Sequence, residues 1–553
     1  MVLLFKEELM ANLALSVVAT IGLISAGQFS GWTFKGLFAC VFAVNFGIQI
    51  IWDVLVYPYF VSPLRNLPLV PGMVSQLTIL MDQPRGKRPL QWMRDIPNDG
   101  LIHFRGAFNA SYLIATNHQA LLDIMSTNTY DFEKPWKARE FLARIIGFGL
   151  ILSEGNAHRV QRKALTPAFN IKNIRGLYGL MWEKTNILLG ELEREARENP
   201  MEGMGSGESG KVEMSVWASR LTLDVIGPVA MGRDFQSLTH KENKVADSFL
   251  AILEPSREKL IFLGVNFVFP QWLARLVPGM GRLHRVIDEE TGYLRRVCHE
   301  IVREKRIALK SQKAVDMQEL EADILGTIML RGEFSDDELV DQMLTFLAAG
   351  HETTASALTW ACYLLCLHPS VQTRLREEIH AAIPAANHAV TWNQLESMPL
   401  LNGVCQEVLR LYPTVPATVR EAIRDTVVAG TPIPRGTRIT LCPYATNRSP
   451  HFWGPTSEQF LPERWIDTDE KGNQSVNHHG GAPTNFAQIT FLHGQRSCIG
   501  KDFARAELRC AVAGVVGGFV MEMQDPAQEI HVAGAVTTKP REGMHLKMTT
   551  VEW

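Results

Sequence analysis

The body of the chain carries a helical pattern of apolar positions over most of its length. Residues 171–199 place apolar side chains three and four positions apart, and residues 279–310 repeat this pattern. A third stretch, 335–368, begins with Ser335 and three acidic residues, which is typical of a capped helix start. Because spacings of three and four keep side chains on one helix face, the pattern predicts long helices with one apolar face.

Strand-like stretches interrupt the helical pattern near both ends of the body. Residues 101–130 alternate two strand-like pieces with one helical piece, and residues 413–490 consist of strand-like pieces, prolines and loops. A last helix is predicted from Cys498 to about residue 516, before short strand-like tails. The pattern predicts a mainly α fold with minor β sheets.

The first 60 residues differ from the body, because they contain two long apolar runs, 11–28 and 36–52. Each run approaches the roughly 20 residues that span a bilayer. Aromatic residues flank the runs, as they do at membrane interfaces: Trp32, Trp52, Tyr57 and Tyr59. A cleavable signal peptide fits less well, because two acids offset Lys6 and no clear cleavage site precedes a soluble sequence.

The number of membrane crossings is left open at one or two, since Asn45, Gln49 and Asp53 weaken the second run. Residues 61–75 are rich in proline and predict a stiff connector between the anchor and the body. Basic residues follow the second run, so the positive-inside tendency places the body in the cytosol.

Composition excludes few classes of function. The 553 residues carry a formal net charge of −3, which gives no electrostatic case for nucleic-acid binding. The eight cysteines include no CxxC pair, so a disulfide framework is not expected and a reducing compartment is favoured.

One cysteine stands in an unusual loop, FLHGQRSCIG, which ends at Gly500. The predicted helix start at Cys498 and the nearby Arg496 would both lower the pKa of the thiol. A structural thiol, a nucleophile and a metal ligand are the three alternatives for Cys498. A nucleophile would need a histidine base that the sequence does not single out, and zinc or iron–sulfur sites need several ligands. Haem iron needs only one axial protein ligand.

The loop resembles the haem-binding loop of the cytochrome P450 monooxygenases, FxxGxRxCxG, at Phe491, Gly494, Arg496, Cys498 and Gly500. The resemblance implies haem b with Cys498 as the axial thiolate and Arg496 paired with a haem propionate. Glycines would let the flat macrocycle approach the backbone, and Phe491 would shield the sulfur. The resemblance also implies one large haem domain, residues 76–553, behind the membrane anchor, residues 1–60.

A second part of the resemblance is AGHETT, Ala349 to Thr354, inside the predicted helix 335–368. A zinc HExxH site is excluded, because position 355 is alanine. In the family, a glycine opens the helix above the iron, and an acid–alcohol pair relays protons to dioxygen. The resemblance assigns these proton-relay roles to Glu352 and Thr353; a buried polar helix turn is the alternative.

A third part joins an ExxR pair, Glu407 and Arg410, to the arginine of FLPERW, Arg464. The spacing alone means little, since Glu191 and Arg194 share it on another helix. In the family these three residues form a charged triad that shapes the haem pocket. Trp465 stands where phenylalanine is commoner, which is a mild departure.

Further haem contacts are implied at HRVQR, where many family members carry WxxxR. His158 and Arg162 would contact a propionate, and the histidine form is associated with filamentous-fungal members. Arg420 also resembles a propionate-pairing arginine, with a solvated strand residue as the alternative.

The implied reaction inserts one oxygen atom from O₂ into a lipophilic small molecule. Electrons would come from NADPH through a separate NADPH–cytochrome P450 reductase, with both proteins in the endoplasmic reticulum membrane. The fungal character suggests a tailoring step in secondary metabolism. Substrate contacts are expected from residues 140–153 and from Thr345, Phe346, Ala349, Val415, Ala417 and Val419. An isomerase or dehydratase that needs no external electrons, and a non-catalytic haem protein, are the alternatives.

Overall fold

Long helices form the framework of the computed structural model, which describes all residues except 1, 28, 30, 73–78, 80–81, 202–208, 255, 269–270, 311–322, 332–333 and 535. The predicted helix at 279–310 is α14 (Met280–Lys310). The predicted helix at 171–199 is divided at Leu177 into α8 (Ile171–Gly176) and α9 (Tyr178–Glu198). The helical prediction is therefore confirmed, with one break that the apolar pattern does not reveal.

The 32-residue helix α17 (Asp336–Leu367) occupies the centre of the fold. Its start is fixed by a capping box, in which Ser335 Oγ accepts from the Glu338 N–H and the Glu338 side chain accepts from the Ser335 N–H. Apolar side chains of α10 (Met214–Met231), α20 (Pro399–Leu411) and α23 (Lys501–Gly518) pack with it in the main core. Side chains on α17 thus reach several parts of the molecule.

The remaining helices complete the body: α4 (Lys87–Asp95), α5 (His118–Leu122), α6 (Trp136–Ile146), α7 (Gly155–Leu165), α11 (Lys244–Leu253), α12 (Arg257–Val268), α13 (Gln271–Ala274), α16 (Ile324–Arg331), α18 (Pro369–Ala382), α19 (Trp392–Ser397), α21 (Pro443–Thr446) and α22 (Pro450–Trp453).

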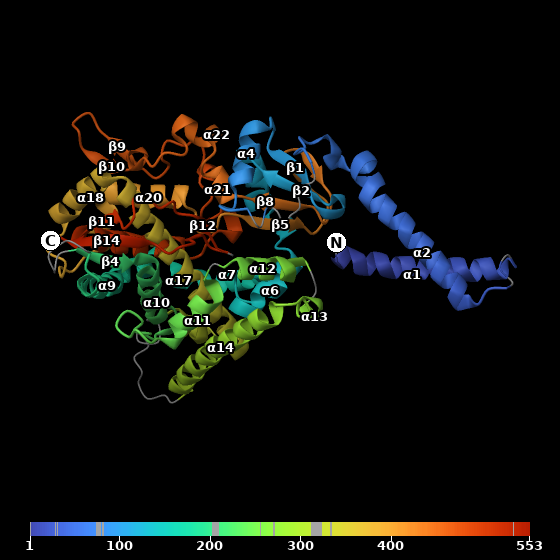
Figure 1. Ribbon diagram of the computed structural model, residues 1–553, viewed down its shortest axis with the longest axis horizontal. Helices are drawn as coiled ribbons and strands as arrows, with labels where there is room; N and C mark the ends of the chain where they lie inside the picture. The colour runs from blue at the N-terminus through green and yellow to red at the C-terminus, as the bar shows by residue number, and fades with distance from the viewer. Residues whose placement is uncertain are drawn as a thin grey trace.

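The main sheet has the strand order β1–β2–β8–β5–β3. Strands β1 (Leu101–Arg105) and β2 (Ser111–Ala115) form a hairpin, with Leu101 opposite Ala115. The other members are β8 (Arg438–Leu441), β5 (Thr418–Ala422) and β3 (Phe132–Glu133). This sheet and the loops around it carry a second apolar core beside the helical one (Figure 1).

Four smaller sheets border the helices. The sheet β11–β14–β4 joins Phe519–Met523, His545–Thr550 and Ser209–Glu213. The three two-stranded sheets are β6 (Thr426–Val428) with β7 (Thr431–Ile433), β9 (Ile466–Thr468) with β10 (Gln474–Val476), and β12 (Val532–Ala533) with β13 (Lys539–Pro540). These strands confirm the prediction of minor β structure within a mainly α fold.

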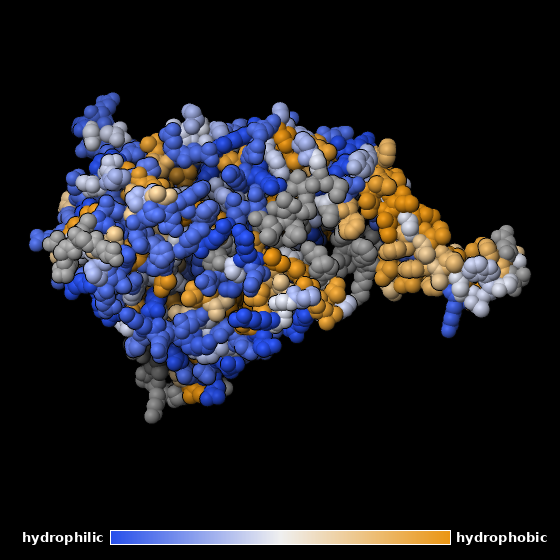
Figure 2. Space-filling model, viewed as in Figure 1, coloured by the Kyte–Doolittle hydropathy of each residue, from blue (hydrophilic) through white to orange (hydrophobic). Residues whose placement is uncertain are grey.

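Two apolar helices project from the body at its amino-terminal end (Figure 1). Helix α1 (Val2–Ser25) runs antiparallel to α2 (Phe34–Ile51), which continues through a π-helical turn to Val61. The stretch Phe34–Val61 is long and apolar enough to cross a membrane, whereas the apolar part of α1, Leu9–Ser25, is shorter. Figure 2 shows the hydrophobic surface gathered over this projection and the adjoining edge of the body.

Polar side chains connect the two projecting helices. Asn12 Nδ2 donates to Gln49 Oε1 at 2.9 Å, and Asn45 Nδ2 donates to Ser16 Oγ at 3.0 Å. Two of the polar residues that weaken the second apolar run are therefore paired across the helices instead of facing outward. The connector after them also packs on the body, since Leu64 and Val70 are buried; residues 73–75 of the connector lie outside the described part of the chain.

Candidate active site

Cys498 lies in a tight loop that leads into α23. The Cys498 N–H donates to the Phe491 carbonyl at 2.8 Å, and the Ser497 N–H donates to the Gly494 carbonyl at 3.1 Å. Helix α23 begins at Lys501, with Gly500 as its cap. The prediction that Cys498 itself begins the helix is wrong, because Ile499 and Gly500 lie between Cys498 and the first helical residue, Lys501.

The expected effect on the thiol is also corrected. Burial raises the pKa of Cys498 and is the largest influence, while the Gly500 N–H, Arg162 and Lys501 act to lower it. The side chain has accessible area because it borders a cavity, yet it lies deep within the protein, and depth determines the direction of the shift. Arg496 does not provide the expected lowering, because it pairs with Glu154.

The two glycines of the cysteine loop differ in how strictly the structure requires them. Gly494 has a φ of 68°, and a Cβ there would come within 2.0 Å of the Met125 carbonyl oxygen. Gly500 has ordinary backbone angles, and the nearest atom to a Cβ at this position would be in Phe169 at 3.9 Å. Close approach to the backbone of the 123–127 turn therefore explains Gly494, whereas Gly500 has room for a side chain.

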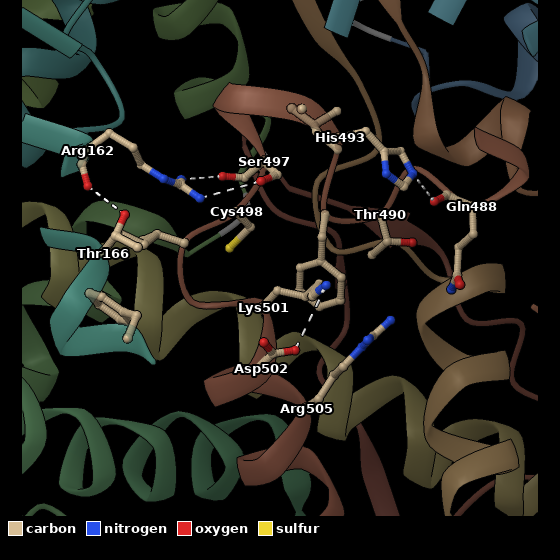
Figure 3. Close-up of a pocket in the computed structure, with 15 residues that line it drawn as sticks. Arg162, Thr166, Gln488, Thr490, His493, Ser497, Cys498, Lys501, Asp502 and Arg505 are labelled. Carbon is tan, nitrogen blue, oxygen red and sulfur yellow. Dashed lines mark hydrogen bonds and ion pairs between the residues drawn. The ribbon is translucent and has the colours of Figure 1, made fainter. Parts of the chain in front are cut away.

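A cavity of about 360 Å³ opens beside Cys498. Figure 3 shows the sulfur among side chains from α7, the cysteine loop and α23. The lining includes Arg162, Thr166, Phe169, Phe491, Lys501 and Arg505. The expected position of Phe491 beside the cysteine agrees with this lining, and its ring lies 5.5 Å from the Arg505 guanidinium.

Arg162 connects α7 to the cysteine loop. Its Nη1 donates to the Ser497 carbonyl at 2.6 Å, which fixes the backbone directly before Cys498. His158, one turn earlier, is buried, and its Nδ1 lies 3.1 Å from the Tyr130 hydroxyl. Burial, followed by the charge of Arg496, lowers the pKa of His158 to about 3, so this imidazole is neutral at physiological pH.

Buried cations gather around Glu154, next to this loop. Arg496 forms an ion pair with Glu154 Oε2, and the Lys134 ammonium lies 3.9 Å from Glu154 Oε1. Arg420 is buried nearby, and burial lowers its pKa to about 10. Burial and the charge of Arg420 lower the pKa of Lys134 to about 7. The carboxylate of Glu154 is shared among more positive charge than it can compensate.

The cationic group fits an anionic ligand. Neither Nε nor Nη2 of Arg496 has a hydrogen-bond partner among the described residues, although the side chain is 6% exposed. Buried guanidinium N–H groups without partners are costly, so the arrangement favours a group with additional carboxylates. Haem b, which carries two propionates and accepts an axial thiolate, fits both the cations and Cys498.

The AGHETT turn lies within a continuous α17. Thr353 Oγ1 donates to the Ala349 carbonyl at 2.7 Å. A Cβ at Gly350 would come within 2.8 Å of Ile226, so this glycine permits close packing of α10 on α17. The expected opening of the helix at Gly350 is therefore not observed, because the side chain of Ile226 occupies the space beside it.

Glu352 is buried and accepts a hydrogen bond from Thr537 Oγ1 at 2.9 Å. Its Oε1 also forms an ion pair of 2.8 Å with Lys539 Nζ. Among the described residues, the hydrogen-bond and ion-pair partners of Glu352 thus come from the carboxyl-terminal hairpin β12–β13.

The structure brings Glu407, Arg410 and Arg464 together. Arg410 donates to both carboxylate oxygens of Glu407, at 2.7 and 2.8 Å, and Arg464 Nε donates to Glu407 Oε1 at 3.1 Å. Trp465 Nε1 donates to Glu407 Oε2 at 2.8 Å. The departure from phenylalanine therefore adds a fourth member to the buried network, since phenylalanine has no donor.

The residues expected to touch substrate are spread over three segments. Thr345 Oγ1 donates to the Ile146 carbonyl at 2.9 Å, which joins α17 to the 140–153 segment. The Phe346 ring lies 5.6 Å from Phe169, a lining residue of the Cys498 cavity. Ala349 provides the acceptor for Thr353, and the partly buried residues Val415, Ala417 and Val419 lie in and before β5.

Sequence reasoning missed Glu154, Lys134, Thr537 and Lys539. None of them belongs to a recognisable motif, and each meets its partner only through the fold. The sequence offered one indirect signal: Arg496 in the cysteine loop, once buried, needs negative charge nearby.

Comparison with known proteins identifies the family. The cytochrome P450 family profile matches residues 108–546. The chain is 37% identical over 515 residues to cytochrome P450 monooxygenase sphH of Aspergillus fumigatus, with 91% of each chain covered. It is 34% identical over 545 residues to cytochrome P450 monooxygenase FUM15 of Gibberella moniliformis, with 91% of each chain covered. It is also 34% identical to ptmK of Penicillium ochrochloron, covering 92% of this chain and 99% of that one. The chain therefore belongs to the cytochrome P450 family and is a cytochrome P450 monooxygenase.

Proposed function

We propose that this monooxygenase inserts one oxygen atom from O₂ into a lipophilic small molecule during fungal secondary metabolism. Electrons would come from NADPH through a membrane-bound NADPH–cytochrome P450 reductase. The observation that supports this proposal most strongly is the cavity beside Cys498, whose loop also carries Arg496 of the buried cation group around Glu154. The relatives are fungal cytochrome P450 monooxygenases, which favours a tailoring reaction of the same kind.

Haem b would be held by Cys498 as the axial ligand, with Phe491 beside it. The propionates would pair with three arginines, Arg496, Arg162 and Arg420. The neutral imidazole of His158 would offer a further contact to a propionate. A haem iron with an axial thiolate activates dioxygen and favours cleavage of the O–O bond. Gly494 allows the loop to pack on the 123–127 turn, and Gly500 caps α23.

Glu352 and Thr353 would deliver protons during this reaction. Thr353 already donates its hydroxyl proton to Ala349, so its oxygen lone pairs remain available to accept another proton. Glu352 lies next to it in the chain and carries a buried carboxylate. General acid–base residues of this kind typically contribute about 10² to 10⁴ in rate.

The buried network of Glu407, Arg410, Arg464 and Trp465 has a structural role. It joins α20 to the 462–465 turn and satisfies every polar atom of the Glu407 carboxylate. Substrate would be met by Thr345, Phe346 and Ala349 on α17 and by Val415, Ala417 and Val419 before and within β5.

Residues 1–60 would anchor the enzyme in the endoplasmic reticulum membrane, with residues 61–75 as connector and 76–553 as the cytosolic haem domain. The hydrogen bonds from Asn12 to Gln49 and from Asn45 to Ser16 favour two crossings, because polar side chains in lipid need partners. A glycosylation acceptor added at the amino terminus should then stay unmodified, whereas one placed between α1 and α2 should be glycosylated. Glycosylation at the amino terminus would instead support a single crossing by α2, in which the site between the two helices would be modified as well.

The proposed function is tested with the full chain in a lipid membrane. Carbon monoxide added to the reduced protein should give the thiolate-type absorption band, and Cys498→Ala should remove it. An unchanged spectrum in that variant would refute the ligand assignment. Product formation should require both NADPH and the reductase, whereas an isomerase or dehydratase would turn over without them.

The substrate class is tested by deleting the gene in its host. A lipophilic intermediate that lacks one oxygen atom should accumulate, and the purified enzyme should convert it to the oxygenated product. Accumulation of a compound with the same oxygen content as the final product would contradict a monooxygenase role.

A further inference from the structure

The carboxyl-terminal hairpin β12–β13 is attached to the middle of α17. Ser356 Oγ donates to the Thr538 carbonyl at 2.5 Å, and Trp360 Nε1 donates to the same oxygen at 3.4 Å. The Thr538 N–H donates to the Thr414 carbonyl at 2.8 Å. Three buried hydrogen bonds therefore fix the position of Thr538, and with it the residues on both sides.

The two neighbours of Thr538 both hold Glu352. Thr537 Oγ1 donates to Glu352 Oε1 at 2.9 Å, and Lys539 Nζ lies 2.8 Å from the same oxygen. The side chains of Glu352 and Lys539 are 4% and 16% exposed, so water screens the pair only weakly. The hairpin thus fixes one oxygen of this carboxylate from two directions.

The other carboxylate oxygen is left free for a different partner. No hydrogen bond to Glu352 Oε2 occurs among the described residues, and this atom does not belong to the buried polar atoms that lack a partner. A carboxylate fixed through Oε1 cannot rotate freely, so Oε2 keeps a defined direction. Fixed direction is the property that a residue passing protons to a neighbour requires.

The charges near the pair come from three elements. Lys539 acts on Lys259 of α12 and on His351 of α17, and it contributes to lowering the pKa of both. Burial is the main cause in each case, and it lowers the pKa of His351 to about 4. His351 is therefore neutral, and Glu352 is the acid that directly compensates Lys539.

We propose that Lys539 and Thr537 are positioning residues for proton delivery, which act by fixing the carboxylate of Glu352. This inference rests on the proposed role of Glu352 as a proton donor. It assigns part of the oxygen-activation machinery to the carboxyl-terminal hairpin, which lies far from AGHETT in the chain. Neither Lys539 nor Thr537 would touch the reacting atoms.

The experiment compares two ways of driving the enzyme in membranes. The route through NADPH and the reductase consumes O₂ and needs protons delivered to the bound oxygen. Cumene hydroperoxide supplies an O–O bond whose outer oxygen already bears an alkyl group, so this route depends less on proton delivery by the protein. Oxygen consumption reports the first route, and oxidation of tetramethyl-p-phenylenediamine by cumene hydroperoxide reports the second. The variants are Glu352→Gln, Lys539→Met, Lys539→Arg and Thr537→Val.

Lys547→Met serves as the matched control. Lys547 lies on β14, also near the carboxyl terminus, and forms an ion pair of 2.8 Å with Glu522 of β11 instead of Glu352. Unfolding temperature and the reduced carbon monoxide spectrum are recorded for every variant, so that loss of folding or of haem is recognised. Hydrogen exchange of the Thr538 amide reports whether the hairpin keeps its hydrogen bond to the Thr414 carbonyl, and so its position.

The expected result is a selective loss of the NADPH route. Glu352→Gln should lower it by about 10² and Lys539→Met by about tenfold, while both retain the peroxide route. Thr537→Val should lower it by about threefold, and Lys539→Arg should recover most of the wild-type rate. Lys547→Met should match the wild type by both routes.

The double variant Glu352→Gln with Lys539→Met gives the decisive comparison. If Lys539 acts through Glu352, the second substitution should cause no further loss. Additive losses would overturn this inference but not the proposed role of Glu352. The same holds if Glu352→Gln impairs the NADPH route and Lys539→Met does not. An unaffected NADPH route in Glu352→Gln would overturn the proposed role of Glu352 and this inference with it.

Discussion

Arg496 lies against Glu154 in an ion pair whose side chains are only 6% and 4% exposed. Lys134 and Arg420 share the same surroundings, so several cations lie around the carboxylate of Glu154. Glu154 supplies negative charge to the guanidinium group that we propose as the partner of a haem propionate.

Glu154→Gln should destabilise the haem-free protein more than the haem-bound protein. Removing one partner of a buried pair typically costs about 3–5 kcal/mol, because the other charge remains buried. Bound propionates would restore part of the lost compensation. Unfolding temperatures with and without haem measure this difference. Glu463→Gln, in an exposed pair with Arg374, is the control and should change neither form. An equal loss in both forms would contradict the role of the cation group in holding haem.

Lys134 should make the haem-free protein more stable at pH 9 than at pH 7. Burial lowers the pKa of Lys134 to about 7, so above this pH the unfolded chain binds more protons there than the folded chain. Stability then rises with pH by at most about 1.4 kcal/mol per unit, and by less because 22% of the side chain is accessible. Denaturant unfolding of Lys134→Met at the two pH values should show a smaller rise. A rise as large as that of the wild type would assign the effect to another group.

Arg410→Met should prevent stable folding or haem retention. Arg410 is fully buried, and besides Glu407 it donates to the carbonyls of Asn447, Ser457 and Gln459. The loss should be at least about 3–5 kcal/mol, because Glu407 would remain as a buried charge. Arg194→Met removes the arginine of an ion pair with the same spacing, Glu191–Arg194, in which Arg194 is 45% exposed. That variant should unfold within about 0.5 kcal/mol of the wild type. Similar losses in the two variants would show that burial does not separate the two pairs.

Glu507→Gln should remove a pH dependence of stability that begins at the ordinary pKa of glutamate and extends to higher pH. Burial raises the pKa of Glu507 well above its usual value. The Thr354 hydroxyl is close enough to oppose the shift, yet neither carboxyl oxygen makes a hydrogen bond of normal geometry among the described residues. The folded chain therefore holds this proton more tightly than the unfolded chain.

The stability that comes from protonated Glu507 is fully present below the unfolded pKa and is lost as pH rises towards the folded one. One proton corresponds to about 1.4 kcal/mol per pH unit in that interval. Glutamine resembles the neutral acid, so the variant should unfold like the wild type below the unfolded pKa and become more stable than the wild type as pH rises above it. Thermal unfolding across this range measures the difference. Parallel pH profiles for the two proteins would mean that Glu507 is ionised in the folded state.

The sequence predicted those parts of the site that depend on local pattern. Ser335 and its acids marked the start of α17 correctly, and the loop around Cys498 pointed to the family that the comparisons show. The local pattern gave the wrong prediction where packing between helices determines the role of a residue. Gly350 was expected to open a helix, but its missing side chain makes room for Ile226 on α10.

Long-range partners could not be predicted for a different reason. Glu154 precedes HRVQR and Lys539 lies near the carboxyl terminus, and nothing in either segment indicates which buried charge it meets. The direction of the Cys498 pKa shift was missed because nearby cations can be read from the sequence, whereas depth of burial cannot.

The pairing of α1 with α2 restrains how the body sits above a membrane. A lone helix can spin about its own axis, but two helices joined from Asn12 to Gln49 form a stem with a fixed orientation. That orientation continues into the body, because Asn109 donates to the Val54 carbonyl at 2.8 Å and Arg105 lies 3.8 Å above the Tyr59 ring. In a membrane, the same edge of the enzyme would therefore always face the lipid.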